Sequence, residues 1–92
     1  MPEVHFTIRW PDGVEEQCYS PSTAIRSHLE TGQTYPVPEF LQHVRAGLNE
    51  ASDRVAAKYG FACSSAMDQL ARIEQTAASQ APDGHVACLS FS

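Results

Sequence analysis

The chain has 92 residues, of which 42% are hydrophobic and 18% charged, a composition typical of one folded domain over residues 1–92. Its formal charge is −5, with eleven acidic residues against six Lys and Arg, which disfavours binding to nucleic acid or to a membrane surface. No apolar run is long enough to cross a bilayer, and the three cysteines are odd in number and widely spaced, unlike a secreted disulfide framework. These totals predict a cytoplasmic protein with reduced thiols.

The chain opens with two predicted strands. Residues 4–10 alternate apolar and polar side chains, which is the period of a half-buried strand. A Pro-Asp-Gly turn follows at residues 11–13. Residues 14–20 form a second strand with two glutamates and a glutamine at its centre, and such polar strands are typical of a sheet edge. The sequence therefore predicts an N-terminal hairpin.

Two helices are predicted next. A Ser-Pro-Ser motif at residues 20–22 begins a short helix that runs to about Leu29, and two prolines keep residues 33–38 extended. The longest helix follows and ends at Gly60. Its apolar stripe has helical spacing: Leu41, Val44, Leu48, Ala51, Val55 and Tyr59. Gly47 lies inside this helix, where glycine is unfavourable, and predicts close packing against another helix or a partner.

A third helix begins near Ser64 or Ser65 and stops before Pro82, with Asp68 expected to pair with Arg72 on its outer face. Residues 85–91 form the last strand. The resulting order is β-β-α-α-α-β in an α+β fold. We expect a three-stranded antiparallel sheet in the order 2-1-3, with the helices packed on one face.

The last strand would lie at an edge of this sheet. It carries alternating Ala87, Leu89 and Phe91 and no charged residue of the kind that protects an edge. Pairing with a second copy would satisfy its free backbone groups, so the sequence predicts a homodimer. The alternative is that a helix or the C-terminal residues cover this edge within one chain.

Cys63 is the one weak candidate for a catalytic residue. It precedes the third helix, where free backbone N–H groups and the helix dipole lower a thiol pKa and favour the thiolate. No His, Lys or Arg is near it in sequence. The favoured interpretation is a small buried side chain beside Phe61, because free cysteine is among the most buried residue types.

The histidines do not have the spacing of metal ligands. His5, His28, His43 and His85 lie on four different predicted elements. His85 and Cys88 are three apart on a strand, so their side chains point to opposite faces. The sequence thus predicts no metal site, no cofactor and no phosphate-binding loop.

Three separated motifs occur in order along the chain: Arg9-Trp10-Pro11-Asp12-Gly13, Cys18-Tyr19-Ser20-Pro21-Ser22, and the stretch from Ala51 through Lys58-Tyr59-Gly60-Phe61 and Cys63-Ser64 to Leu70-Ala71-Arg72-Ile73-Glu74. With these motifs the sequence resembles a family of small bacterial nitrogen-starvation-response proteins over nearly its whole length. The resemblance implies a nitrogen-linked context and association with enzymes encoded beside such proteins, a nitrilase and a radical S-adenosylmethionine enzyme. It implies no activity, ligand or catalytic residue.

Two classes of function follow. The leading hypothesis is a non-catalytic accessory or interaction protein linked to the nitrogen-starvation response. The alternative is a small enzyme or redox sensor that uses Cys63. Reactivity of the Cys63 thiol across pH separates the two hypotheses. Only a thiol with a lowered pKa forms enough thiolate to react well below the usual thiol pKa.

Overall fold

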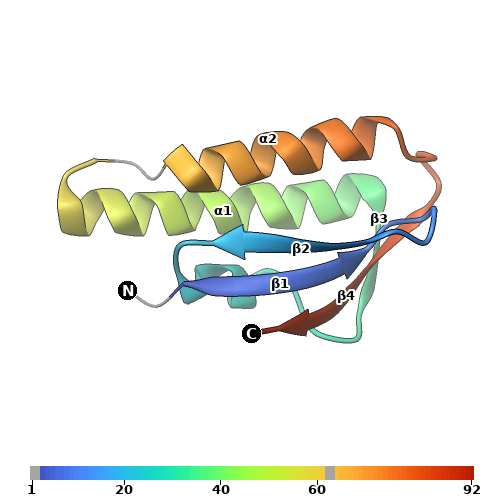
Figure 1. Cartoon of the computed structure of the whole chain (residues 1–92), viewed down its shortest axis with the longest axis horizontal. Helices are drawn as coiled ribbons and strands as arrows, with labels where there is room; N and C mark the ends of the chain where they lie inside the picture. The colour runs from blue at the N-terminus through green and yellow to red at the C-terminus, as the bar shows by residue number, and fades with distance from the viewer. Residues whose placement is uncertain (1–2, 62–63) are drawn as a thin grey trace.

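The computed structural model describes residues 3–61 and 64–92, which fold into one antiparallel sheet with helices on one face (Figure 1). The elements in chain order are β1 (Val4–Arg9), β2 (Glu15–Ser20), the 3₁₀ helix η1 (Thr23–Ser27), β3 (Thr34–Pro36), α1 (Val37–Tyr59), α2 (Ser64–Ala78) and β4 (His85–Phe91). The predicted α+β class is therefore confirmed. Neither α-helix of the described chain has the length and apolar content that a membrane crossing requires.

The sheet has four strands in the order β2-β1-β4-β3, all antiparallel. The three predicted strands have the relative order expected, with β1 between the other two. β1 is central because its alternating side chains Val4, Phe6 and Ile8 are buried beneath the helices. The polar strand β2 lies at an edge, as predicted.

The fourth strand, β3, is a correction. The sequence predicted only an extended linker at residues 33–38, but Thr34 pairs with Ala87 and Pro36 pairs with His85. Proline is tolerated here because β3 is the other edge of the sheet, where a missing N–H breaks no ladder. β4 consequently lies between β1 and β3 and is not an edge strand. The predicted homodimer loses its basis, because the chain itself covers the edge through which a second copy was expected to pair.

The buried face of β4 also differs from the sequence pattern of Ala87, Leu89 and Phe91. The structure buries Val86 and Cys88, and the pairing with β1 shifts register between Thr7 and Ile8. Leu89 is the extra residue of this irregularity, and it returns Phe91 to the helix side. There the Phe91 ring packs against Phe6 at 6.3 Å between centroids.

Most ends of the two long helices lie where the sequence predicted them. α1 begins directly after Pro36 and ends at Gly60, whose φ of +85° is the left-handed conformation that glycine favours. Its central stripe is buried, but α1 runs past the end of the sheet (Figure 1), so Tyr59 is 53% exposed. α2 lies beside α1 and packs on β2, while α1 packs on β3 and β4.

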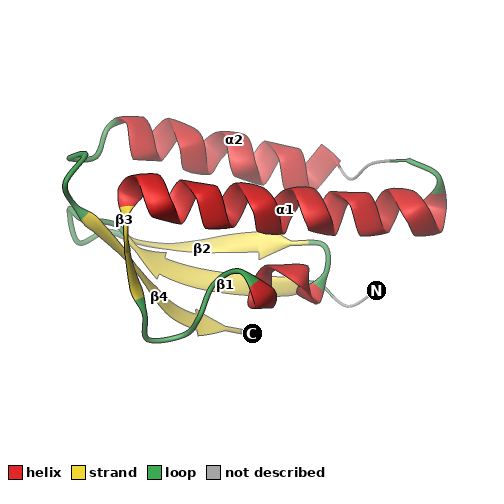
Figure 2. Cartoon of the chain, turned by 180° about the vertical axis from the view of Figure 1, so that it is seen from behind, coloured by secondary structure: helices red, strands yellow, loops and turns green. Residues whose placement is uncertain are grey.

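The first predicted helix, over residues 20–29, is wrong in type and length: it is the five-residue 3₁₀ helix η1. Figure 2 shows η1 beside α1, between that helix and the sheet. Gly47 permits this contact, since a Cβ there would meet Ile25 Cδ1 at 2.5 Å. The predicted close packing at Gly47 is confirmed, with η1 as the neighbour.

Candidate functional site

Neither cysteine in the described part of the chain is a candidate nucleophile. Burial raises the pKa of the Cys18 thiol strongly, and the Glu16 carboxylate raises it further through its charge and a hydrogen bond, against a smaller lowering by Arg72. Burial also raises the pKa of Cys88. Both thiols are therefore protonated at neutral pH. The sequence candidate, Cys63, lies outside the described residues.

The four histidines lie on different parts of the fold. His5 lies against the Tyr19 ring, and His43 lies against Glu39. His85 is exposed at the start of β4, whereas Cys88 is buried, so these two point to opposite faces. Within residues 3–61 and 64–92, no three His, Cys, Asp or Glu side chains gather as a metal site would require.

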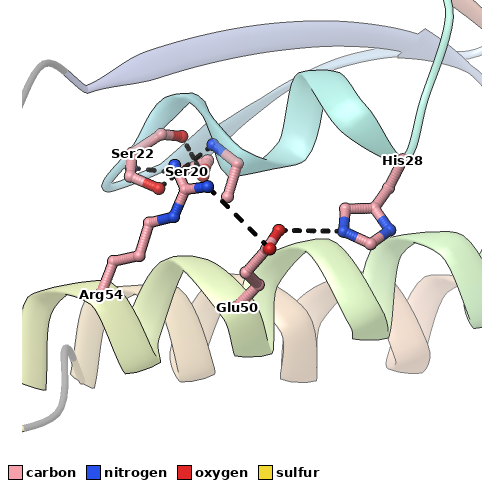
Figure 3. Close-up of polar contacts among 6 residues, drawn as sticks. Ser20, Ser22, His28, Glu50 and Arg54 are labelled. Carbon is pink, nitrogen blue, oxygen red and sulfur yellow. Dashed lines mark hydrogen bonds and ion pairs between the residues drawn. The ribbon is translucent and has the colours of Figure 1, made fainter. Parts of the chain in front are cut away.

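The remaining histidine, His28, belongs to a polar cluster between η1 and α1 (Figure 3). Its Nε2 lies 3.0 Å from Oε2 of Glu50, and Arg54 Nη2 approaches Oε1 of the same carboxylate at 3.9 Å. On the other side of η1, the Ser20 hydroxyl donates to the carbonyl of Ser22 at 2.8 Å. The His28–Glu50 contact joins the end of η1 to α1, and the Ser20–Ser22 bond holds the chain just before η1.

A shallow pocket of about 290 Å³ adjoins this cluster at the end of η1. Its lining runs from Arg26 to Glu30 and includes Tyr35. Two of its polar groups are engaged within the chain: the Tyr35 hydroxyl accepts the Glu30 N–H at 3.0 Å, and the Arg26 guanidinium lies 5.5 Å from the centre of the Phe91 ring.

A second cavity of about 290 Å³ lies at the opposite edge of the sheet, between β2 and α2. We call it the β2–α2 groove and define it by its lining residues: Tyr19, Ser65, Asp68, Gln69 and Arg72. Gln69 is only 6% exposed, and its Oε1 accepts the backbone N–H of Tyr19 at 3.0 Å. A buried side chain of α2 therefore binds the backbone of an edge strand.

The backbone of β2 faces outward at every second residue. Trp10 donates its N–H to the carbonyl of Val14, and the register pairs Ile8 with Glu16 and Phe6 with Cys18. Residues 14, 16 and 18 therefore direct their backbone groups at β1, because antiparallel partners alternate in this way. Glu15, Gln17 and Tyr19 direct theirs away from β1, and Tyr19 lines the groove.

Arg72 differs from the other arginines of the described chain. Arg9, Arg45 and Arg54 each pair with a glutamate, and Arg26 covers the Phe91 ring. The predicted Asp68–Arg72 ion pair is wrong: among residues 3–61 and 64–92, Arg72 has no carboxylate within 4 Å. Its charge nevertheless lowers the pKa of Cys18 in β2. The groove thus contains an arginine that no carboxylate of the described residues neutralises.

Sequence reasoning identified the polar edge strand but not the groove. The only available signal was the run of glutamates and glutamine in residues 15–17. The contact that builds the groove joins Gln69 to Tyr19 across fifty residues, and no local pattern encodes a contact of that separation.

The fold and the site define a small α+β protein whose sheet is covered by helices on one face and has an outward-facing, polar edge. The chain belongs to the family of nitrogen starvation-induced protein NitG, whose family model matches residues 5–91. The resemblance found in the sequence motifs is thereby confirmed. No curated protein and no solved structure matches the chain.

Proposed function

We propose that this protein is a non-catalytic accessory component of the nitrogen-starvation response and that it acts by binding a partner protein at the β2–α2 groove. One observation carries the proposal: the outward backbone groups of Glu15 and Gln17 continue along β2 from Tyr19, which lines a groove whose Arg72 has no ion pair with residues 3–61 or 64–92. Edge strands with such groups are a common site of protein recognition. The family match supplies the nitrogen context.

The ionisable side chains elsewhere support an interaction role over a catalytic one. His28 and His43 contact glutamates of α1, and the thiols of Cys18 and Cys88 are buried with raised pKa values. These contacts serve the packing of η1, α1 and the core. The alternative, an enzyme or redox sensor built on Cys63, has no observation in the described residues that favours it.

The sequence resemblance suggests which partners to test first, namely the nitrilase and the radical S-adenosylmethionine enzyme encoded beside such proteins. Association with either enzyme is a proposal, as is a cytoplasmic location. A homodimer through β4 is not proposed, because β3 occupies that edge.

The test uses two substitutions at one position. Gln17→Pro removes an outward N–H and leaves the β1 ladder intact, whereas Gln17→Ala keeps that N–H. Tagged proteins are used to isolate partners from nitrogen-starved cells, and each partner is purified and its binding measured by calorimetry. We expect binding to survive Gln17→Ala and Phe61→Ser, at the far end of α1, and to be lost in folded Gln17→Pro. Equal binding by Gln17→Pro would place the interface elsewhere.

A further inference from the structure

The chemistry of the β2–α2 groove indicates what kind of partner it fits. We propose that it binds an extended segment of the partner protein, which adds to β2 as a fifth strand and places a single carboxylate against Arg72. This inference rests on the proposed function and specifies the partner at the same site. Its three supports are the exposed backbone of β2, the position of the Gln69 carboxamide and the charge of Arg72, which has no ion pair within the part of the chain that the structure describes.

The backbone of β2 selects an extended chain. Glu15 and Gln17 are exposed and direct both their N–H and C=O groups away from β1. An added strand offers carbonyl and N–H groups at the same repeat, so it can satisfy these groups in order. A helix cannot, because its own backbone groups are already paired.

Gln69 marks where such a strand ends. Its side-chain amide is chemically a peptide group, and its oxygen already occupies the acceptor position in front of the Tyr19 N–H. Because Gln69 is buried, displacing it would expose an unsatisfied amide in the interior. The added strand therefore pairs with Glu15 and Gln17 and stops at Tyr19, which fixes its register relative to the groove.

Arg72 gives the segment its charge. Alternate side chains of an added strand point to the helix side of the sheet, where α2 presents Arg72 and Asp68 to the groove. A carboxylate on the segment would pair with the guanidinium, which has no acidic partner among the described residues. Asp68 lies one turn before Arg72 and repels a second carboxylate, so the segment carries one acidic residue beside neutral ones.

The probe is a random-peptide library displayed on phage, selected against the full-length protein. Enriched peptides are then synthesised with a fluorophore, and their binding is measured by anisotropy. We expect the enriched peptides to share one Asp or Glu position. Gln17→Pro and Arg72→Gln should each weaken binding by about tenfold or more. The matched controls, Gln17→Ala and Arg45→Gln, should change the Kd by less than about twofold.

A charge reversal tests the assignment of Arg72 directly. Arg72→Glu should reject the acidic peptide and bind the same peptide with Lys at that position. Hydrogen exchange of the unaltered protein supplies a measurement that does not depend on how Gln17→Pro folds: the bound peptide should slow exchange of the Gln17 amide by about tenfold, with the Tyr19 amide unchanged.

The outcomes separate this inference from the proposed function. Peptides that need the Gln17 N–H but show no acidic position would overturn the role of Arg72 and leave the interface in place. Strand addition would be overturned if the enriched peptides left hydrogen exchange of the Gln17 amide unaltered. It would also be overturned if no peptide were enriched. The proposed function would fall separately, if purified partner proteins bound Gln17→Pro as well as Gln17→Ala.

Discussion

Gly47 is the residue at which helix propensity and packing oppose each other. Alanine is favoured over glycine inside a helix by about 1 kcal/mol. In this fold, however, a Cβ at position 47 would approach Ile25 Cδ1 at 2.5 Å and the Ile25 Cα at 3.3 Å. Ile25 is fully buried, so its backbone has little room to move.

We predict that Gly47→Ala lowers the free energy of unfolding by about 1 kcal/mol, because overpacking outweighs the gain in propensity. Urea denaturation measures this difference. Adding Ile25→Val, which removes Cδ1, should recover part of this loss. The double variant should then lose less free energy of unfolding than the two single variants lose together. A Gly47→Ala protein more stable than the unaltered one would contradict the close contact.

The buried thiols make stability depend on pH on the alkaline side. The pKa values of Cys18 and Cys88 are raised from 9.0 in the folded protein, chiefly by burial. Above about pH 9 the unfolded chain loses these protons and the folded chain keeps them, so unfolding becomes more favourable as pH rises. Below that pH the two thiols have no effect on the pH dependence.

We therefore predict that the free energy of unfolding falls above pH 9 by up to about 1.4 kcal/mol per pH unit for each thiol. Urea denaturation between pH 8 and about pH 10.5 measures the slope. Cys18→Ala is the control. Whatever its overall stability, its free energy of unfolding should fall less steeply with pH, by the contribution of one thiol. An identical slope in this variant would show that Cys18 does not remain protonated.

Among the elements, η1 is held at its start by the N-cap residue that precedes it, Ser22. Ser22 is buried, and its hydroxyl accepts the N–H of Ala24 at 3.2 Å. Ala24 is itself buried, so this N–H has no water to replace the serine oxygen.

We predict that Ser22→Ala lowers the free energy of unfolding by about 1–2 kcal/mol, as the loss of an N-cap does. Thr23→Ala, at the exposed neighbouring position, is the matched control and should change stability by less than about 0.5 kcal/mol. Both values come from urea denaturation. If the two variants were equally stable, the cap would have no role in holding η1 against α1.

At the scale of the whole molecule, charge decides which partners are excluded. The net charge is −5, and the five arginines lie on β1, η1, α1 and α2 without forming a continuous basic surface. Four of them are engaged by a glutamate or an aromatic ring. Nucleic acid needs several phosphates neutralised along one track.

We predict no binding of single-stranded or double-stranded DNA or of RNA at micromolar protein and physiological salt. Fluorescence anisotropy of labelled oligonucleotides measures this, with a salt titration for any signal that appears. Tight binding that weakens steeply with salt would contradict the prediction, since that slope counts released counterions.

Much of the fold was predictable because its signals are local. The alternation in β1 and the stripe of α1 each repeat with the period of one element, and Gly13 and Gly60 have the positive φ that their positions required. Such patterns need only neighbouring residues. The predictions failed at the short elements. η1 has too few residues to show a helical repeat of apolar side chains, and the residues of β3 form a strand only by pairing with the distant β4.

Local sequence patterns were enough to predict the α+β class, the two hairpin strands, the two long helices, the central place of β1 and the family. Three features became visible only in the packed fold: β3 covers β4, Phe91 returns to the core past Leu89, and Gln69 meets Tyr19 beside Arg72. The physical reason is separation along the chain. Periodicity and turn chemistry act between near neighbours, whereas each of these contacts joins residues about fifty or more apart, which meet only when the whole sheet and its helices have packed.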